Sequence, residues 1–301
     1  MASLRVAVVS RDPEVRLAAA RAFDGAPASW RVELHRSVPA EADVLVFGPD
    51  CSGTGVVFDP AAPGRVLEEV AVAAGNVRSP LVAVTSPGGG AGATTLALHL
   101  AQAYAASGAA TCFVDLDVRW GASDRLGLPD DARTWAELDE AEDSLALCAL
   151  PVAAGFRALL APRLEGEDAR PAAADAVLRR VCEHYERVVA DAPDGELLDT
   201  ALLHARAAVA IMTPALPAAR RMRAFLSRYP EVTWAVVTNR IGPGGEARRA
   251  RLEDALERRI AVELPCAAAL RDAEDEARLL SASWSRWQRA ATRLARALEH
   301  E

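Results

Sequence analysis

Lysine is absent from this 301-residue chain, and all 34 of its basic residues are arginines. A place where a motif expects lysine must therefore be compared with a background in which arginine is the normal basic residue. The 42 acidic residues leave a formal net charge of −8, which argues against nucleic-acid binding as the main task. We expect no specific nucleic acid among the partners.

Long apolar runs and cysteine motifs are missing as well. No apolar run approaches the roughly 20 residues that a membrane-spanning helix needs, and the opening MASLRVAVVS lacks the charged-then-apolar pattern of a signal peptide. The five cysteines are scattered without a CxxC pair, so neither a disulfide framework nor a zinc site is indicated. These absences predict a soluble cytoplasmic protein with buried thiols.

What the chain does contain is an alternation of strands and helices that begins twice. Residues 1–76 predict a small α/β domain and residues 77–282 a larger one, with a linker at 76–80. In the small domain we expect strands at 5–9, 31–35 and 43–47 and helices at 12–23 and 63–73. In the large domain we expect strands at 81–85, 110–115, 156–161, 187–191, 208–213, 232–238 and 260–264, and helices at 94–107, 131–140, 171–185, 198–206, 216–228, 244–258 and 267–280.

Several of these strands are nearly continuous apolar runs, such as AVAIM and WAVVT. Such runs are typical of parallel strands that helices cover on both faces. The predicted fold class is therefore α/β, with a doubly wound, mostly parallel sheet that binds ligands at the carboxyl ends of its strands.

The stretch SPGGGAGATT, residues 86–95, lies between the first strand and the first helix of the large domain. A P-loop reads GxxxxGK[ST], whereas here Pro87 stands at the first glycine and Ala93 at the lysine. The backbone N–H groups of residues 88–93 can still surround a phosphate at the positive end of the helix, and Thr94 can hold Mg²⁺ by its hydroxyl. The cation that normally contacts the β- and γ-phosphates is missing.

The same letters also fit the dinucleotide pattern GxGxxA, at Gly88, Gly90 and Ala93. Asp115 follows about 20 residues later at a strand end, where an acid that binds ribose is expected. An NAD(P)-binding enzyme and a tight glycine turn without a ligand are therefore both open alternatives at this point.

Three further segments follow predicted strands: FVDLDVRWGASD at 113–124, VVADAPDG at 188–195 and VVTNRIGPGG at 236–245. Together with the loop they resemble the ParA/MinD superfamily of deviant P-loop ATPases, over about residues 80–280. The nearest resemblance is to its CpaE/TadZ branch, in particular to the actinobacterial CpaE-like septum-site-determining (Ssd) proteins. The resemblance implies a P-loop NTPase-like fold and the formation of a homodimer.

By this resemblance, residues 88–95 correspond to the family loop KGGxGKTT. Asp117 would face the attacking water or the metal, Asp191 with Thr94 would hold Mg²⁺, and Asn239 would read adenine. The nucleotide-binding positions implied in this way are Gly88, Gly89, Gly90, Gly92, Ala93, Thr94, Thr95, Asp115 and Asn239.

The departures from the family are as informative as the matches. Gly88 stands at the place of the signature lysine, which reaches the partner's phosphate across the dimer, and Ala93 at that of the second lysine. A bias toward arginine does not explain glycine or alanine at these places, although Arg119 or Arg125 could substitute. Loss of one charge-assisted phosphate contact costs roughly 1.5–3 kcal/mol of binding.

We therefore expect a pseudo-ATPase that uses no catalytic residue, in which Asp117 and Asp191 are vestigial. No cofactor is required, and weak binding of ATP or ADP with magnesium is the residual activity we expect.

The N-terminal domain resembles a truncated response-regulator receiver, which the CpaE/TadZ branch often carries. Its strand VLVF is followed by Gly48, and Asp50 comes two places later than a phosphate-accepting aspartate would. We expect no phosphorylation, and either a docking or dimerising module or a plain stabilising subdomain.

Residues 283–301 predict a separate amphipathic helix. Trp284, Trp287, Ala291, Leu294 and Leu298 share one face, and Arg286, Arg289, Arg293 and Arg296 repeat on another. Such a helix can lie on an anionic membrane surface, as the C-terminal helix of MinD does, or bind a partner. Packing onto the domain is the outcome we favour, because an apolar stripe at helical spacing usually faces a core.

The leading functional hypothesis is a non-hydrolysing spatial regulator or scaffold. It would serve Tad/Flp pilus or secretion machinery, with its secretion ATPase as partner, or septum placement, with division proteins as partners. The protein would be cytoplasmic and recruited to the inner membrane at the pole or septum. The alternatives are an active ATP-dependent dimerisation switch and an NAD(P)-binding enzyme.

Overall fold

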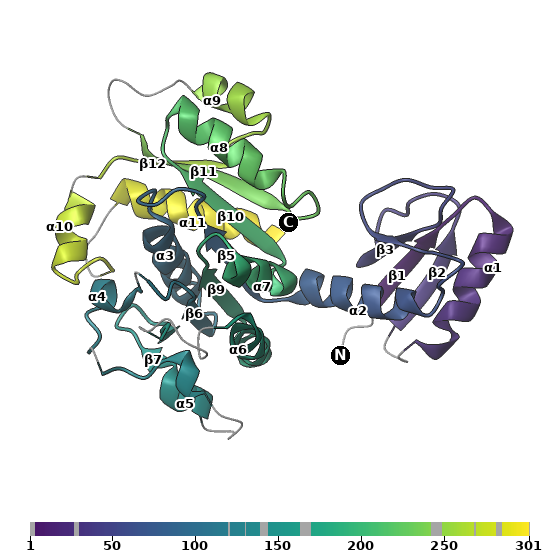
Figure 1. Cartoon of the computed structure of the whole chain (residues 1–301), viewed down its shortest axis with the longest axis horizontal. Coiled ribbons are helices and arrows are strands. Elements are labelled where there is room, and N and C mark those ends of the chain that lie inside the picture. The colour runs from purple at the N-terminus through teal and green to yellow at the C-terminus, as the bar shows by residue number, and fades with distance from the viewer. Residues whose placement is uncertain are drawn as a thin grey trace. The chain divides into compact units, whose positions relative to one another are not determined.

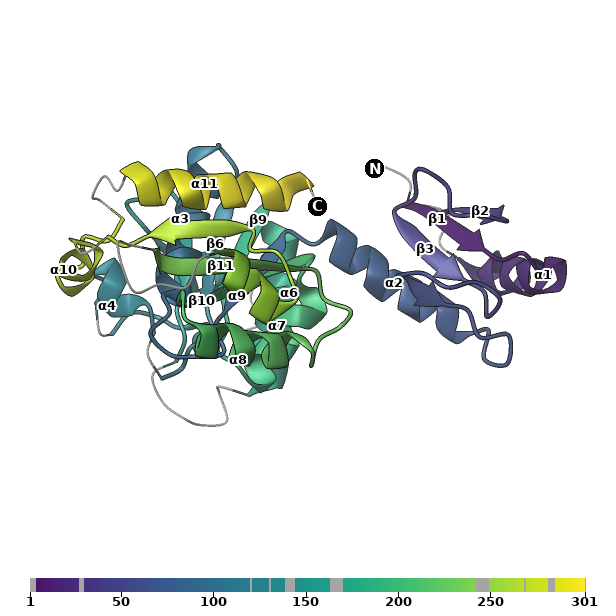
Figure 2. The same ribbon diagram turned by 90° about the horizontal axis from the view of Figure 1, so that it is seen from above.

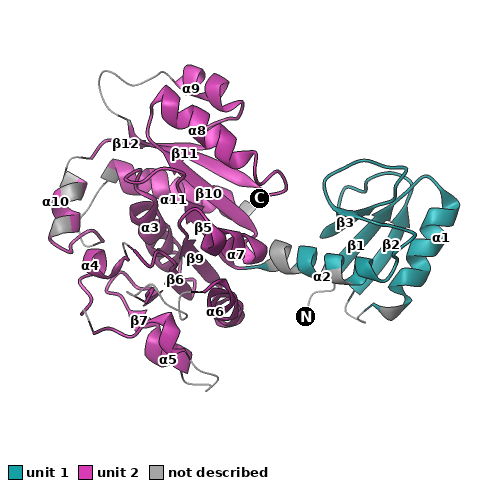
Figure 3. Cartoon of the chain, in the orientation of Figure 1, with its two compact units in different colours: residues 1–79 teal, residues 80–301 magenta. Residues whose placement is uncertain are grey.

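The computed structural model describes residues 4–26, 30–119, 121–129, 131–138, 144–162, 170–241, 249–267, 269–280 and 285–300. The chain divides into two compact units, residues 1–79 and 80–301 (Figure 3).

Unit 1 is a four-stranded parallel sheet with two long helices. Its elements are β1 (Leu4–Val9), α1 (Pro13–Ala22), β2 (Trp30–His35), β3 (Val44–Phe47), β4 (Val56–Val57) and α2 (Arg65–Arg78). The strand order β2-β1-β3-β4 is that of the flavodoxin-like doubly wound sheet without its fifth strand. Asp12 caps α1 by accepting the N–H of Glu14 at 2.8 Å, and Pro13 fills the first turn.

Unit 2 contains an eight-stranded sheet in the order β12-β11-β10-β5-β9-β6-β8-β7. The strands are β5 (Leu81–Thr85), β6 (Thr111–Asp115), β7 (Leu150–Pro151), β8 (Arg157–Leu159), β9 (Arg187–Asp191), β10 (Ala207–Met212), β11 (Trp234–Ile241) and β12 (Val262–Pro265). Every pairing in this sheet is parallel except that of β7 with β8. The predicted α/β, mostly parallel fold class is confirmed.

Helices cover both faces of this sheet (Figures 1 and 2). One face packs against α6 (Pro171–His184), α7 (Glu196–His204), α8 (Leu216–Leu226) and α9 (Arg249–Leu256); the other packs against α3 (Ala93–Ala106) and α11 (Ser285–His300). Alternate residues of a strand point to opposite faces, so Leu81 and Ala83 join the first core while Val82 and Val84 join the second. This double burial explains the continuous apolar runs of the central strands.

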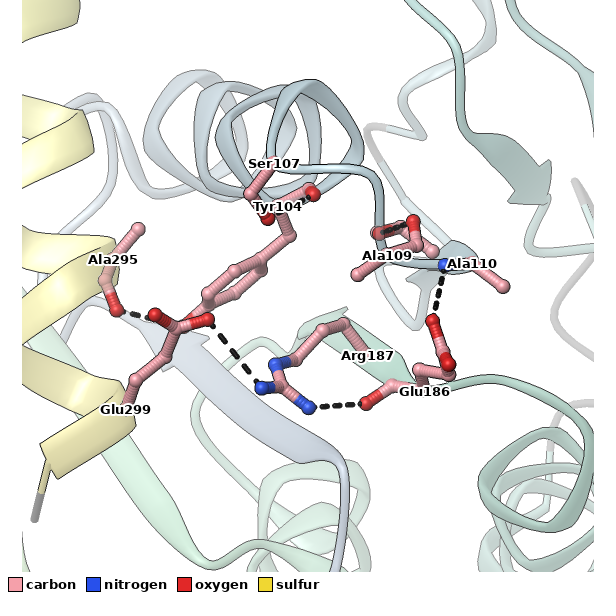
Figure 4. A network of polar contacts seen from close by, with 9 residues as sticks. Tyr104, Ser107, Ala109, Ala110, Glu186, Arg187, Ala295 and Glu299 are labelled. Carbon is pink, nitrogen blue, oxygen red and sulfur yellow. Dashed lines mark hydrogen bonds and ion pairs between the residues drawn. The ribbon is translucent and has the colours of Figure 1, made fainter.

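The C-terminal helix α11 is part of unit 2. Trp287, Ala290, Ala291, Leu294, Ala295 and Leu298 are buried in the same core as α3. Figure 4 shows how its last turns are held: Tyr104 on α3 donates to the carbonyl of Ala295 at 3.4 Å, and Arg187 on β9 pairs with Glu299 at 3.4 Å. The expectation that this helix packs onto the domain is confirmed for the described residues 285–300.

Two expectations about elements need correction. Of the segment 131–140, the described residues 131–138 form no α-helix and contain a single 3-10 turn at Trp135–Glu137, which begins with a reciprocal capping box of Thr134 and Glu137. The region instead carries the short helices α4 (Ser123–Leu126) and α5 (Ser144–Cys148). The linker expected at 76–80 is helical as far as Arg78, because α2 continues through it.

Candidate functional site

The glycine loop follows β5 and ends at the N-terminus of α3. Gly90 and Gly92 have φ angles of 73° and 97°, in the left-handed region that favours glycine. A Cβ on Gly92 would lie 2.6 Å from Nδ2 of Asn239, so packing as well as conformation requires glycine there. At the start of the loop, Ser86 Oγ donates to the carbonyl of Gly88 at 2.7 Å and closes a local turn. The loop thus keeps the backbone shape that leads into a helix N-terminus.

The loop opens into a cavity of about 960 Å³ at the carboxyl ends of the strands. Its lining includes all of residues 86–95 together with Asp117, Arg119, Arg125, Asp191, Asp194, Asn239, Arg240, Cys266, Leu270, Asp272 and Glu274. A second cavity of about 690 Å³ adjoins it and shares Asp117, Arg119, Arg125 and Glu274. Most of the predicted site residues therefore meet in one place, which has the size of a small-ligand pocket.

Asp115 and Asp191 end the paired strands β6 and β9, and they lie opposite each other in register. Asp115 is 1% and Asp191 4% exposed. Asp115 is fully used inside the protein: one carboxylate oxygen accepts the N–H of Asp117 at 3.0 Å and the other that of Ala122 at 2.6 Å. Asp115 lines the smaller cavity and not the larger one, and its nucleotide-binding role stays a prediction.

Asp191 differs from Asp115, because its Oδ2 atom is buried and has no hydrogen-bond partner among the described residues. Burial raises the pKa of Asp191 to about 7, and the charges of Asp115 and Asp117 act in the same direction. A hydrogen bond from Thr94 and the charge of Arg125 oppose this rise in the pKa. Burial likewise raises the pKa of Asp115, to about 6.

The oxygens of Thr94 and Asp191 suit Mg²⁺, which prefers hard oxygen ligands and usually takes one or two from the protein and the rest from phosphates and water. Asp191 Oδ2 is an orphaned buried acceptor on the cavity wall, and the Thr94 hydroxyl lies within hydrogen-bond reach of the same carboxylate. The two residues therefore fit the predicted magnesium role. A bound ion would lower the pKa of Asp191 and neutralise its negative charge.

Asn239 ties the loop to the rest of unit 2. Its Nδ2 donates to the carbonyl of Ala91 at 2.9 Å, while its Oδ1 accepts from the backbone N–H of Arg240 at 2.8 Å and from Trp287 Nε1 at 3.4 Å. These bonds give Asn239 a positioning role for the loop, which the sequence did not predict. Its role in reading adenine stays a prediction.

Glu274 on α10 (Ala269–Asp275) is a site residue that the sequence did not reveal. Its Oε1 accepts a hydrogen bond from the Thr95 hydroxyl, in the first turn of α3, and lies 3.6 Å from Nε of Arg125 on α4. The Glu274 carboxylate therefore lies at the positive N-terminal end of α3, where a phosphate would be stabilised. Glu274 lies 179 residues after Thr95 in the chain, so no local motif could have indicated it.

The other predicted residues are placed as follows. Trp287 is 1% exposed and packs with its ring centroid 4.5 Å from that of His99 on α3, so it cannot contact a membrane in this fold. Arg286, Arg289 and Arg293 are exposed on α11, whereas Trp284 lies outside the described residues. Among the described residues, no helix combines the length and apolarity that crossing a membrane requires.

In unit 1, Asp50 is held inside a hydrogen-bond network. It accepts from the Ser10 hydroxyl at 2.6 Å and from the backbone N–H groups of Arg11 and Asp12 at 2.6 and 3.2 Å. The Ser10 hydrogen bond is the main cause that lowers the pKa of Asp50 to about 2. These hydrogen bonds anchor the turn through the Asp50 carboxylate.

Comparison with known proteins gives a family and a set of similar structures. Residues 82–281 match the family model described as the CobQ/CobB/MinD/ParA nucleotide binding domain. No curated protein sequence matches the chain.

Several solved structures share the fold. The septum site-determining protein MinD of Pyrococcus horikoshii, complexed with Mg-ADP, is 19% identical with a TM-score of 0.63, over 73% of this chain and 95% of that one. The MinC:MinD cell division protein complex of Aquifex aeolicus is 19% identical with a TM-score of 0.60, over 73% of this chain and 96% of that one. Cobyrinic acid a,c-diamide synthase of Mycobacterium smegmatis, with bound ADP and magnesium, is 18% identical with a TM-score of 0.55, over 73% of this chain and 94% of that one.

Proposed function

Since the chain belongs to the CobQ/CobB/MinD/ParA nucleotide-binding family, we propose that it is a ParA/MinD-type spatial regulator or scaffold that does not hydrolyse nucleotide. The observation that carries the proposal is a phosphate loop with its backbone shape intact and no cationic side chain in residues 86–95. A ligand there would be held by backbone N–H groups and the α3 dipole, without the lysine that stabilises charge in phosphoryl transfer.

The acidic residues of the site also support a protein that does not hydrolyse nucleotide. Asp191 on the cavity wall and the neighbouring Asp115 are buried with raised pKa values, so in the absence of a cation the site disfavours added negative charge. Glu274 adds a further carboxylate beside Thr95. These features favour weak binding of ATP or ADP with magnesium, and no required cofactor.

Within the family, the motifs resemble the CpaE/TadZ branch and its Ssd-like members most. On that basis we propose a deviant P-loop, a homodimer, and a partner that is either a Tad/Flp-type secretion ATPase or a division protein. Recruitment to the inner membrane at the pole or septum belongs to the same proposal. The MinD structure in complex with MinC supports the idea that this fold presents a surface to a partner.

An ATP-dependent dimerisation switch is the second candidate, because Thr94 and Asp191 fit a magnesium ion. Calorimetric titration of the full chain with Mg-ATP, Mg-ADP and NAD, with light scattering for the mass, separates the two. The scaffold predicts weak heats for both adenine nucleotides, none for NAD and an unchanged mass. Tight ATP binding with ATP-dependent doubling of the mass would support the switch instead.

A further inference from the structure

Arg221 on α8 places its guanidinium against the phosphate loop. A Cβ built on Gly88 would lie 3.0 Å from Nη1 of Arg221, and Gly88 is part of the cavity lining. The contact arises from topology, because α8 follows β10, and β10 pairs directly with β5, which leads into the loop. A cation thus lies at the position where the family loop has its signature lysine.

The charge of Arg221 is not used elsewhere. Among the residues that the structure describes, none forms a hydrogen bond or ion pair with its side chain. Two arginines that follow it in the chain do form ion pairs: Arg223 with Glu257 at 2.7 Å, and Arg228 with Asp194 at 2.5 Å. Arg221 is exposed, so its side chain can turn toward a ligand at little cost.

We propose that Arg221, from helix α8 of the same chain, supplies the cation that residues 86–95 lack. In this role it binds the terminal phosphates of a nucleoside di- or triphosphate. This inference rests on the proposed nucleotide site and deepens it. A guanidinium suits the role, because its planar fork of donors can bind two phosphate oxygens at once. Gly88 leaves room for it, since a longer side chain there would compete for the same space.

Two of the arginines that line the cavity, Arg125 and Arg240, are less suited. Arg125 already lies beside Glu274, at 3.6 Å. Arg240 follows Asn239, whose amide packs at Gly92 and Ala91 near the helix end of the loop, whereas Arg221 lies at the opposite end, at Gly88. Among the described residues, Arg221 is the one cation within 4 Å of a Cβ placed on Gly88.

The test is calorimetric titration of the full chain with Mg-ADP and Mg-ATP. Arg221→Ala should weaken both affinities by about tenfold or more, the value expected for one charge-assisted hydrogen bond. Arg220→Ala is the matched control, since Arg220 is also exposed on α8 and has no described partner, and it should leave both affinities unchanged. Thermal unfolding of each variant confirms that the fold is kept.

A charge swap makes the test specific. In the Arg221→Ala background, Gly88→Lys restores a cation to the same place and should recover most of the lost affinity. Equal affinities for Arg221→Ala and Arg220→Ala would overturn the proposal, and so would a wild-type chain that binds neither nucleotide. Hydrolysis of ATP by the wild type would contradict the proposed scaffold function while leaving the role of Arg221 standing.

Discussion

Asp191 is a buried carboxyl group whose ionised form the fold disfavours. Its pKa is raised to about 7 by burial, from 3.8 in the unfolded chain. The folded state therefore holds the proton more tightly, so this contribution to stability is full below pH 4 and is lost as the pH rises through 7. Each pKa unit corresponds to about 1.4 kcal/mol, so the loss is on the order of a few kcal/mol.

We predict that Asp191→Asn stabilises the apo protein, and more at pH 8 than at pH 5, because the amide cannot ionise. Thermal unfolding without magnesium at both pH values measures this. Asp254→Asn, on the exposed side of α9, is the surface control and should change little. A lower unfolding temperature for Asp191→Asn at pH 8 would contradict the assignment of a buried, disfavoured carboxylate.

Glu274 places negative charge at the phosphate-binding end of α3, where it accepts a hydrogen bond from Thr95. We predict that Glu274→Gln raises the affinity for Mg-ADP several-fold, since charge near a helix terminus is worth about 0.3–2 kcal/mol. Asp272→Asn makes the same charge change on the same helix and cavity without a described contact to the loop. An equal gain from both variants would show that only the net charge of the cavity matters.

The residues of the site were predictable to the extent that they belong to motifs. The loop, Asp117, Asp191 and Thr94 each stand at a strand end or helix start with a known pattern, and they meet as expected. Arg221 and Glu274 come from α8 and α10, where the letters around them match no motif. Their place in the site follows from how the strands are ordered, which local patterns do not encode.

At the scale of elements, the contact of α11 with α3 has an acid-sensitive centre. His99 Nδ1 contacts the carbonyl of Thr95 at 2.8 Å, and its ring lies against Trp287. Burial lowers the pKa of His99 to about 4, from 6.5. Its contribution to stability is therefore present above pH 6.5 and is lost as the pH falls toward 4.

When the pH falls from 7 to 5, this histidine is expected to lower the free energy of unfolding by about 2 kcal/mol. We predict that His99→Phe, which keeps an aromatic ring against Trp287, removes most of that loss. Urea unfolding at the two pH values measures it, with His184→Phe on the exposed end of α6 as the control. An acid loss that stays the same in His99→Phe would place its origin elsewhere.

The burial of α11 also decides how membrane binding should be tested. Truncation at residue 283 would remove six buried side chains from the core, so we predict loss of the folded domain rather than a selective effect. Replacing Trp287 alone by Ala should cost about 3–5 kcal/mol. Thermal unfolding checks both, and a truncated chain with an unchanged unfolding temperature would contradict the packing of this helix.

Elements buried on both faces were predictable, and solvent-exposed connections were not. All seven strands expected after residue 80 are present as β5, β6, β8, β9, β10, β11 and β12, because their apolar runs fit only a covered sheet. The prediction of a helix at 131–140 was wrong because of a tertiary contact. Trp135 is buried, and its Nε1 donates to the carbonyl of Asp115 at 2.9 Å. That anchor holds the segment in a turn.

At the scale of the whole molecule, the chain joins a small α/β unit to a unit of the nucleotide-binding family, each with its own core. Unit 1 keeps the strand order of its fold while Asp50 serves as an anchor. Unit 2 combines the glycine loop and the cavity with Thr94 and Asp191, the residues proposed to hold magnesium.

The most direct test of this account is the release of inorganic phosphate from Mg-ATP by the full chain, measured beside Asp117→Ala. Asp117 lines the cavity and is the residue that would face the attacking water in an active relative. We predict that both proteins release phosphate no faster than buffer alone. Turnover by the wild type that Asp117→Ala abolishes would contradict the account and identify a working ATPase.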